Sequence, residues 1–242
     1  MDFLIIYYIL GIIMLPGIIF AAVAQAKIHS AYSEYSQINT KKQTPAKDVA
    51  KQVLERNGLY DVSIEKIPGN LTDNFNPKTK IVSLSENVYN NSSVAAVSVA
   101  LHEVGHAIQH AEHYAPAKMR LWLVPLVNIS SMMLWPLIII GIVIGSFAGF
   151  DNTIGQVFTF AGIAFFGLSM LFSLITLPTE LDASRRAKKQ LAEIGAMDEE
   201  ELEGAKKVLW AAAMTYVASL VVSILTLLRF VLSILILRGN RD

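Results

Sequence analysis

The chain has 242 residues, 20 basic and 20 acidic side chains, no cysteine, and only 17% charged residues. This charge balance excludes a basic nucleic-acid-binding protein, so no nucleic-acid partner is expected. The lack of cysteine excludes disulfides, thiolate zinc sites and a cysteine nucleophile. Soluble domains carry about 25% charged residues. The deficit, together with a mean hydropathy of +0.46, predicts a protein with a large surface in contact with the lipid bilayer.

Four stretches are long and apolar enough to cross a bilayer core as helices, which takes about 20 residues. Ala22-Val23-Ala24 has the small-residue pattern of a signal-peptide cleavage site, but the first run is longer than a signal core and has no preceding Lys or Arg. This favours a retained helix. The fourth stretch contains Arg229 and is predicted as one span or as a bent helical pair. The four stretches are residues 3–26, 121–147, 154–177 and 210–237.

Basic residues are unevenly distributed among the polar segments. Eleven of the 20 lie between Lys27 and Arg120, six lie between Arg185 and Lys207, and the link 149–153 has none. Positive residues near the ends of spans favour the cytoplasm. We therefore expect segments 27–120 and 178–209 in the cytoplasm, and the 149–153 link and the N-terminus outside.

Segment 27–120 is expected to form a small α+β unit. Thr44-Pro45 predicts the capped start of a helix, and Asn57-Gly58 predicts its end. Val62 and Ile64 alternate with polar residues and predict a short strand, and residues 81–85 predict a second strand after a turn. The run 92–113 is predicted to be one long helix capped by serine. The fold class is thus a mostly α membrane protein with about four transmembrane helices and a small cytoplasmic α+β unit.

The long helix carries the motif H-E-x-x-H at His102, Glu103 and His106. Two histidines four residues apart lie on one face of a helix, so both rings can reach one metal ion. A catalytic zinc takes three protein ligands and leaves a position for water, whose proton the intervening glutamate accepts. The motif therefore predicts one zinc ion per chain, held in part by the two histidines, with Glu103 as the catalytic base.

The third zinc ligand is not set by the motif. The metzincin spacing fails because Gln109 and Glu112 replace its glycine and histidine, and His110 lies too far along the helix axis. A distant carboxylate must lie on the same side of the membrane, and two spans return the chain to that side. Glu180, just after the third span, is a candidate, although a helix start after proline also explains an acid there. Asp182 points about 200° away around the helix and is expected behind the ligands or at the surface.

Four separated motifs resemble the bacterial membrane-bound neutral zinc metallopeptidases of the YugP type and, more distantly, the HtpX and CAAX-prenyl protease clan of zincin-like, gluzincin-like peptidases. The resemblance implies a protein of the bacterial cell membrane, and it implies that Glu180 is the third zinc ligand. The clan commonly has aspartate where this chain has Ser184, which leaves open what supports the ligands. The motifs are HEVGHAIQH (102–110), LTDNFNPKTKIVSLSENVY (71–89), LPTELDASRRA (177–187) and TYVASL (215–220).

The leading hypothesis is a zinc endopeptidase at the cytoplasmic membrane surface that cleaves protein or peptide substrates associated with the membrane. Two alternatives are a metal hydrolase acting on a lipid or a lipidated peptide, and a non-catalytic scaffold that the metal only stabilises. A group that stabilises the oxyanion of the reaction is also required. Candidates for that role, or for supporting the ligands, are Arg185, Arg186, Tyr216, His113 and Asp182.

The predicted strand immediately before the long helix suggests how a substrate binds. If this strand is a sheet edge beside the metal, its unpaired N–H and C=O groups can hold an extended peptide as an added strand. The predicted substrate-binding residues are Ile81, Val82, Ser83 and Leu84.

Overall fold

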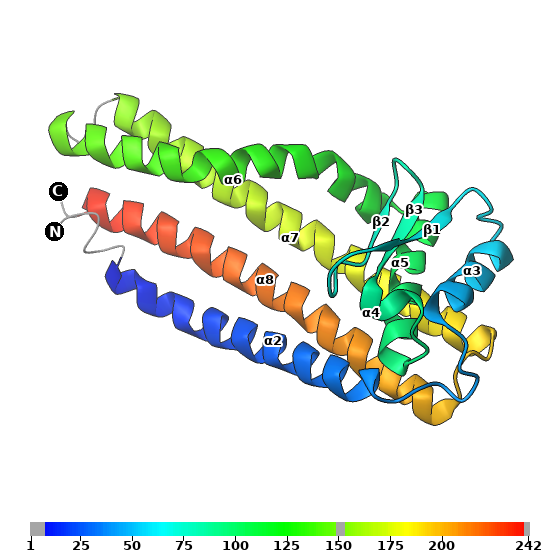
Figure 1. The fold of residues 1–242 in the computed structure, drawn as a ribbon. Coiled ribbons are helices and arrows are strands. Elements are labelled where there is room, and N and C mark those ends of the chain that lie inside the picture. Colours follow the sequence, from blue (N-terminus) through cyan, green and yellow to red (C-terminus); the bar gives the residue numbers. More distant parts are fainter. Residues whose placement is uncertain (1–7, 149–152, 240–242) are drawn as a thin grey trace. The chain divides into compact units, whose positions relative to one another are not determined.

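The computed structural model describes residues 8–148 and 153–239. These residues form helices and one small sheet, as predicted (Figure 1). The chain is organised as two compact units, each built from segments that are distant in sequence: unit 1 contains Met1–Ala22, Met119–Thr176 and Val217–Asp242, and unit 2 contains Val23–Lys118 and Leu177–Tyr216. The elements in chain order are η1 (Leu10–Met14), α2 (Leu15–Ser36), α3 (Ala46–Arg56), β1 (Ser63–Ile67), β2 (Asn74–Asn76), β3 (Ile81–Ser85), α4 (Glu86–Tyr89), α5 (Val94–Ala111), α6 (Ala115–Ala148), α7 (Thr153–Glu193) and α8 (Glu199–Gly239).

Four of the described helical stretches are long and apolar enough to cross a membrane: Leu10–Ser36, Ala115–Gly141, Phe160–Glu193 and Glu199–Ile236. Large apolar side chains on them are exposed, and Trp122 of α6 is 82% exposed. Such surfaces are stable only against lipid or another protein. The finding confirms the prediction of a mostly helical membrane protein with about four spans.

Inside unit 1 the helices pack through aromatic and small residues. The rings of Phe166 in α7 and Phe230 in α8 lie 5.0 Å apart. Gly162 faces the Phe230 ring so closely that an added Cβ would lie 3.0 Å from it. Small residues let helices approach where lipid gives no hydrophobic driving force between them.

Two apolar stretches continue as helix well beyond their predicted ends. Helix α7 runs through Pro178 and ends at Glu193, and α8 is one helix that includes Arg229. The third predicted stretch ends at residue 177, just before Pro178, and a proline removes one backbone hydrogen bond from a helix. The helix nevertheless continues through Pro178. Of the two alternatives for the fourth stretch, one span or a bent helical pair, the structure has a single helix.

Unit 2 contains a three-stranded sheet with the order β1-β3-β2. Strand β3 is parallel to β1 and antiparallel to β2, with Ser83 opposite Glu65 on one side and Asn74 on the other. The prediction that β3 is an edge strand is therefore wrong, because Asn74–Asn76, which looked like part of a turn, pairs with it. Residues Ile81, Val82 and Ser83 are paired on both sides and Leu84 is fully buried, so their backbone is not open to an extended peptide.

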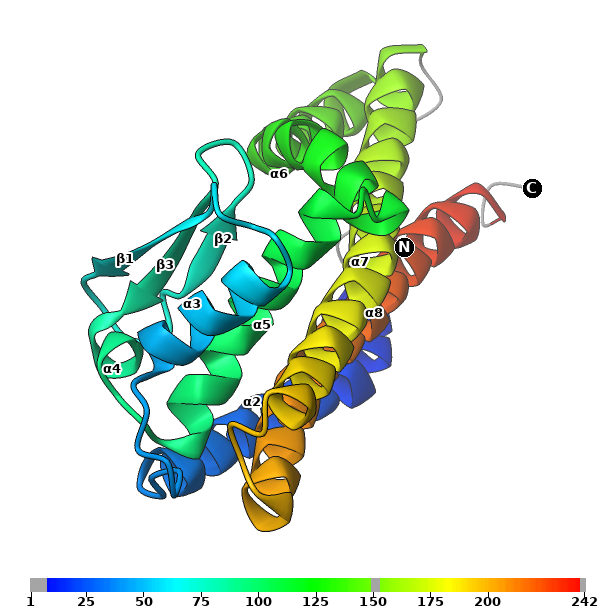
Figure 2. The same cartoon turned by 90° about the vertical axis from the view of Figure 1, so that its right-hand side faces the viewer.

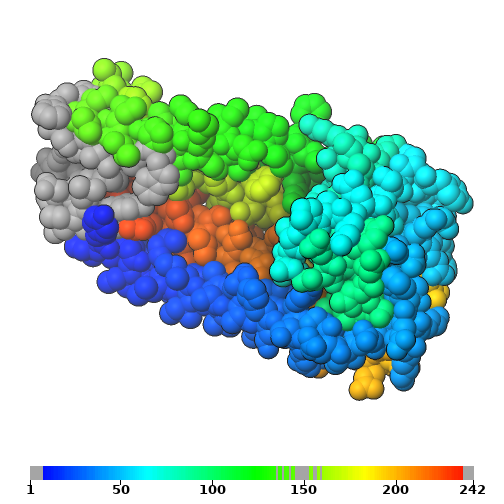
Figure 3. All heavy atoms as spheres, viewed as in Figure 1, coloured from blue at the N-terminus to red at the C-terminus, as the bar shows by residue number. Residues whose placement is uncertain are grey.

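Helices α3 and α5 lie on the same face of this sheet (Figures 1 and 2). In the space-filling view, the atoms of α3, α5 and the strands adjoin one another (Figure 3). The core includes Val53 of α3, Val82 of β3 and Leu101 of α5, each at most 1% exposed. Burial of such side chains contributes about 1.5 to 3 kcal/mol each. This core holds α5 at a fixed position against the sheet.

The ends of α3 and α5 follow local sequence. Ser93 caps α5, since its Oγ accepts a hydrogen bond from the backbone N–H of Ala96 at 3.2 Å. Gly58, just beyond α3, has a φ of +72°, which glycine adopts without strain. Thr44 was predicted to cap α3, but its hydroxyl donates to the Lys42 carbonyl and Pro45 occupies the cap position without a side-chain bond.

Candidate metal centre

A glycine in the H-E-x-x-H motif allows α5 and α7 to approach each other closely (Figure 2). A Cβ placed on Gly105 would lie 2.6 Å from the backbone oxygen of Ala183 in α7, a distance that Cβ atoms do not adopt. Glycine therefore permits a contact that no other residue allows without movement of the backbone. The contact places His102 and His106 opposite Glu180, 78 and 74 positions away in the sequence.

Three side chains converge at this contact. Nε2 of His102 lies 3.1 Å from Oε2 of Glu180, and Nε2 of His106 lies 3.4 Å from the same oxygen. One ligand atom from each residue lies within 4.8 Å of the other two. Glu180 is only 2% exposed, and the two imidazole rings are perpendicular, with centroids 4.8 Å apart. In the described part of the chain this is the one group of this kind.

The donor set fits zinc. Two imidazole nitrogens and one carboxylate oxygen are a standard catalytic zinc set that leaves a fourth position for water. With metal–ligand distances of about 2.0 to 2.1 Å and tetrahedral angles, neighbouring ligand atoms lie about 3.4 Å apart. The separations of 3.1 and 3.4 Å between the nitrogens and Glu180 Oε2 agree with that geometry.

Both histidines are held from behind. Nδ1 of His102 lies 3.2 Å from Oγ of Ser184, and Nδ1 of His106 lies 3.0 Å from Oε1 of Gln109. Bonds of this kind orient a zinc-binding ring and increase the basicity of its free nitrogen. Ser184 thus occupies the place for which the resemblance suggested an aspartate.

Glu103 is buried next to the two histidines, with 8% of its surface exposed. Burial raises the pKa of this carboxyl above its ordinary range, the charges of His102 and His106 act in the opposite direction, and those of Glu180 and Asp73 raise it further. Asp73 immediately precedes β2 and accepts hydrogen bonds from the backbone N–H and the hydroxyl of Ser85 at 2.7 and 3.0 Å. These bonds anchor the start of β2 within electrostatic range of Glu103.

Asp182 lies behind the metal ligands, which agrees with one of the two places expected for it. It is 5% exposed and accepts hydrogen bonds from Gln109, Arg185 and Arg186. Arg186 also donates to Glu112 at 2.6 Å. Arg185 and Arg186 were candidates for oxyanion donors from the sequence. In the structure they donate hydrogen bonds to the carboxylates of Asp182 and Glu112.

The other residues considered from the sequence lie outside the cluster. His110 packs against Phe75 of β2, with ring centroids 6.0 Å apart. His113 follows α5, is exposed and has a φ of +58°. Tyr216 of α8 lines a cavity of about 200 Å³ together with His29 of α2 and Leu71 of the β1–β2 loop. Neither His113 nor Tyr216 is one of the three candidate ligands.

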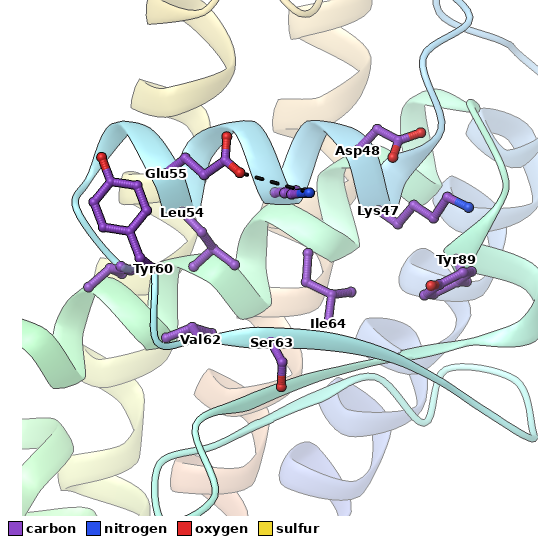
Figure 4. A pocket seen from close by; sticks show the side chains of 11 residues that line it. Lys47, Asp48, Leu54, Glu55, Tyr60, Val62, Ser63, Ile64 and Tyr89 are labelled. Atoms are coloured by element: carbon purple, nitrogen blue, oxygen red, sulfur yellow. Dashed lines mark ion pairs between the residues drawn. The ribbon is translucent and has the colours of Figure 1, made fainter.

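A larger cavity of about 440 Å³ lies between α3 and β1 (Figure 4). Its lining includes Lys47, Tyr60, Ile64 and Tyr89, and Lys47 lies over the Tyr89 ring at 4.9 Å. The cavity adjoins β1, the edge strand farthest in the sheet from β2, and shares no residue with the metal centre. It offers no cluster of metal ligands.

Two residues of the metal centre, Gln109 and Gly105, were not predicted from the sequence. Gln109 was considered only as a departure from the metzincin pattern, and Gly105 was not considered. A signal for Gln109 was present, since it lies three residues after His106 on the same face of a helix that is otherwise apolar there. Gly105 gave no signal, because its role depends on the position of α7.

The chain is similar to known proteins that are described as zinc metallopeptidases or membrane proteases. The model of a family described as "Putative neutral zinc metallopeptidase" matches residues 10–235. The chain is also similar to the "Putative membrane protease YugP" of Bacillus subtilis strain 168, with 43% identity over 209 residues that cover 86% of this chain and 89% of that protein. No solved structure matches the chain.

Proposed function

The chain belongs to the family of neutral zinc metallopeptidases, and from this we propose that it is a membrane-bound zinc endopeptidase that cleaves peptide bonds at the cytoplasmic membrane surface. The observation that carries the proposal is the convergence of His102, His106 and Glu180 from two helices. Glu103, adjacent in sequence to the first histidine, supplies the fourth group that this chemistry requires.

Each residue has a defined task in the proposed reaction. His102, His106 and Glu180 would hold zinc, which would polarise the scissile carbonyl and lower the pKa of the attacking water. Glu103 accepts the proton of the attacking water and passes it to the leaving amine. Its burial keeps other proton donors away from that exchange. The peptide bond breaks, and one product gains a carboxylate while the other gains an amine.

We place the substrate backbone along β2. This strand pairs with β3 on one side only, and no other described strand pairs with its outer edge. Phe75 of β2 packs against His110 of α5, one turn beyond His106. An extended peptide added to this edge would receive backbone hydrogen bonds with little dependence on its sequence.

The cytoplasmic location rests on charge. The two segments that carry the ligands contain 17 of the 20 basic residues, 11 in 27–120 and six in 178–209. The candidate span Ala115–Gly141 and the part of Phe160–Glu193 that precedes Glu180 lie between His106 and Glu180 in the sequence. Two crossings return the chain to the face that it left, so we place both segments on the same side of the membrane. A metal centre on the cytoplasmic side, next to the spans, is within reach of substrates that are associated with the membrane.

The function is tested with the purified full chain in detergent and a quenched fluorescent peptide mixture. We expect Glu103→Gln to keep zinc and to lose about 10² to 10⁴ of the cleavage rate, because the proton acceptor is gone. Glu86→Gln is the matched control, since Glu86 is exposed and forms an ion pair with Lys66, outside the metal centre. Equal cleavage by the wild type and Glu103→Gln would refute a peptidase of this mechanism, and no cleavage by the zinc-loaded wild type would favour a metal-stabilised scaffold.

A further inference from the structure

The side-chain amide of Gln109 is held in one orientation. Gln109 is fully buried, and its Nε2 donates to the backbone oxygen of Thr179 at 2.8 Å and to Oδ2 of Asp182 at 3.0 Å. A backbone carbonyl only accepts hydrogen bonds, so the nitrogen of the amide, and not its oxygen, must face Thr179. Rotation of the amide by 180° would place its oxygen against two other acceptors in a buried site, which is unfavourable.

This orientation determines which atom faces His106. With Nε2 directed at α7, Oε1 of Gln109 lies 3.0 Å from Nδ1 of His106. An amide oxygen only accepts, so Nδ1 must carry the ring proton. A neutral imidazole has one such proton, and its Nε2 therefore keeps a free lone pair. Nε2 is the atom that lies 3.4 Å from Glu180 Oε2.

We propose that Gln109 is a positioning residue, which takes its own orientation from Thr179 of α7 and uses it to fix the His106 ring with Nε2 directed at the metal. The inference rests on the metal site of the proposed function. Ser184 cannot do the same for His102, because a hydroxyl both donates and accepts and so permits either ring tautomer.

The same short stretch of α7 provides the ligand and the orienting groups. Thr179 and Asp182, on either side of Glu180, both bind Gln109, and all three are at most 5% exposed. Docking of α5 on α7 therefore delivers Glu180 to the histidines and orients His106 in a single step. An α5 helix undocked from α7 would keep both histidines but would lose the third ligand and the fixed ring.

The test compares zinc dissociation constants, measured by chelator competition on the full chain in detergent. Gln109→Met keeps the length of the side chain but removes the strong acceptor, and we expect it to weaken zinc binding about 10- to 100-fold. Gln109→Glu keeps an oxygen toward Nδ1 and should bind zinc more tightly than Gln109→Met. Its second oxygen meets the Thr179 carbonyl and the Asp182 carboxylate, which should lower the melting temperature. Gln190→Met is the control, because Gln190 is a buried glutamine of α7 that binds Asn57; its zinc affinity should be unchanged.

If Gln109 only held α5 and α7 together, Gln109→Glu would bind zinc more weakly than Gln109→Met. That result would overturn the proposal. Wild-type zinc affinity in Gln109→Met would also overturn it, while zinc loss in His102→Ala would show that the metal site itself stands. If Gln109→Met does not fold, ¹⁵N NMR of the histidine rings in the zinc-loaded wild type decides alone. The proposal requires a proton on Nδ1 of His106 and is overturned by a proton on Nε2.

Discussion

Oγ of Ser184 lies 3.2 Å from Nδ1 of His102, on the side of the ring opposite to Glu180. Removal of this partner in Ser184→Ala should weaken zinc binding about 10-fold or more, because the ring loses its orienting bond. Ser184→Asp, which restores a carboxylate behind the ring, should bind zinc at least as tightly as the wild type. Chelator competition measures both, and unchanged affinity in Ser184→Ala would show that the hydroxyl is dispensable.

The close contact at Gly105 gives a second prediction. Gly105→Ala should lower the thermal stability and zinc content together, because its Cβ would lie 2.6 Å from the Ala183 carbonyl and push α5 away from α7. Gly167→Ala in α7 is the control, since no atom lies within 4 Å of the added Cβ. Alanine has a higher helix propensity than glycine, so Gly167→Ala should leave the free energy of unfolding the same or raise it by up to about 1 kcal/mol. A Gly105→Ala protein with full zinc and normal melting temperature would contradict the described contact.

The central position of β3 leads to a third prediction. Ser83→Pro should unfold unit 2, because Ser83 is paired with β1 and β2 and a proline removes a ladder hydrogen bond from a central strand. Ser83→Ala removes only the hydrogen bond from its Oγ to Glu65 and should cost about 1 kcal/mol. Limited proteolysis and thermal unfolding distinguish them, and a stable, folded Ser83→Pro protein would mean that β3 is not a central strand.

The orientation in the membrane is tested by labelling single cysteines with a membrane-impermeant thiol reagent in intact cells. A cysteine at Asn152, a position outside the described residues, should react from outside. Cysteines at Lys47 and Lys189 should react only after the cells are opened, because the positive charge of their segments favours the cytoplasm. The native chain has no cysteine, so the background is clean. Reaction at Lys189 in intact cells would place the metal centre outside.

Much of the architecture could be predicted from local sequence. The long helix with His102 and His106 was expected over 92–113 and is observed as Val94–Ala111, and strand Ile81–Ser85 has the predicted bounds. Both carry strong periodic signals and clear flanking residues. The helix after Asn91 and the four apolar stretches needed no knowledge of distant contacts.

Features that depend on pairing between distant segments could not be predicted. Asn74–Asn76 has turn-forming residues and becomes a strand only because β3 offers it a partner. Helix α7 continues through Pro178, because a long apolar helix tolerates the loss of one backbone bond. The roles of Gly105 and Gln109 depend on where α7 lies, which the order of motifs alone does not give. Glu180 was identified by its side of the membrane and by family resemblance, both of which carry long-range information.

The zinc content of Glu180→Ala tests the central claim most directly, because Glu180 is the ligand that only the folded chain brings to the histidines. Measured by elemental analysis on purified protein, the wild type and the control Glu193→Ala should each hold about one zinc per chain. Glu193 lies on the same helix and pairs at its surface with Arg56 and Lys189. The account predicts that Glu180→Ala holds almost none. Full zinc occupancy in a folded Glu180→Ala protein would contradict the proposed metal centre.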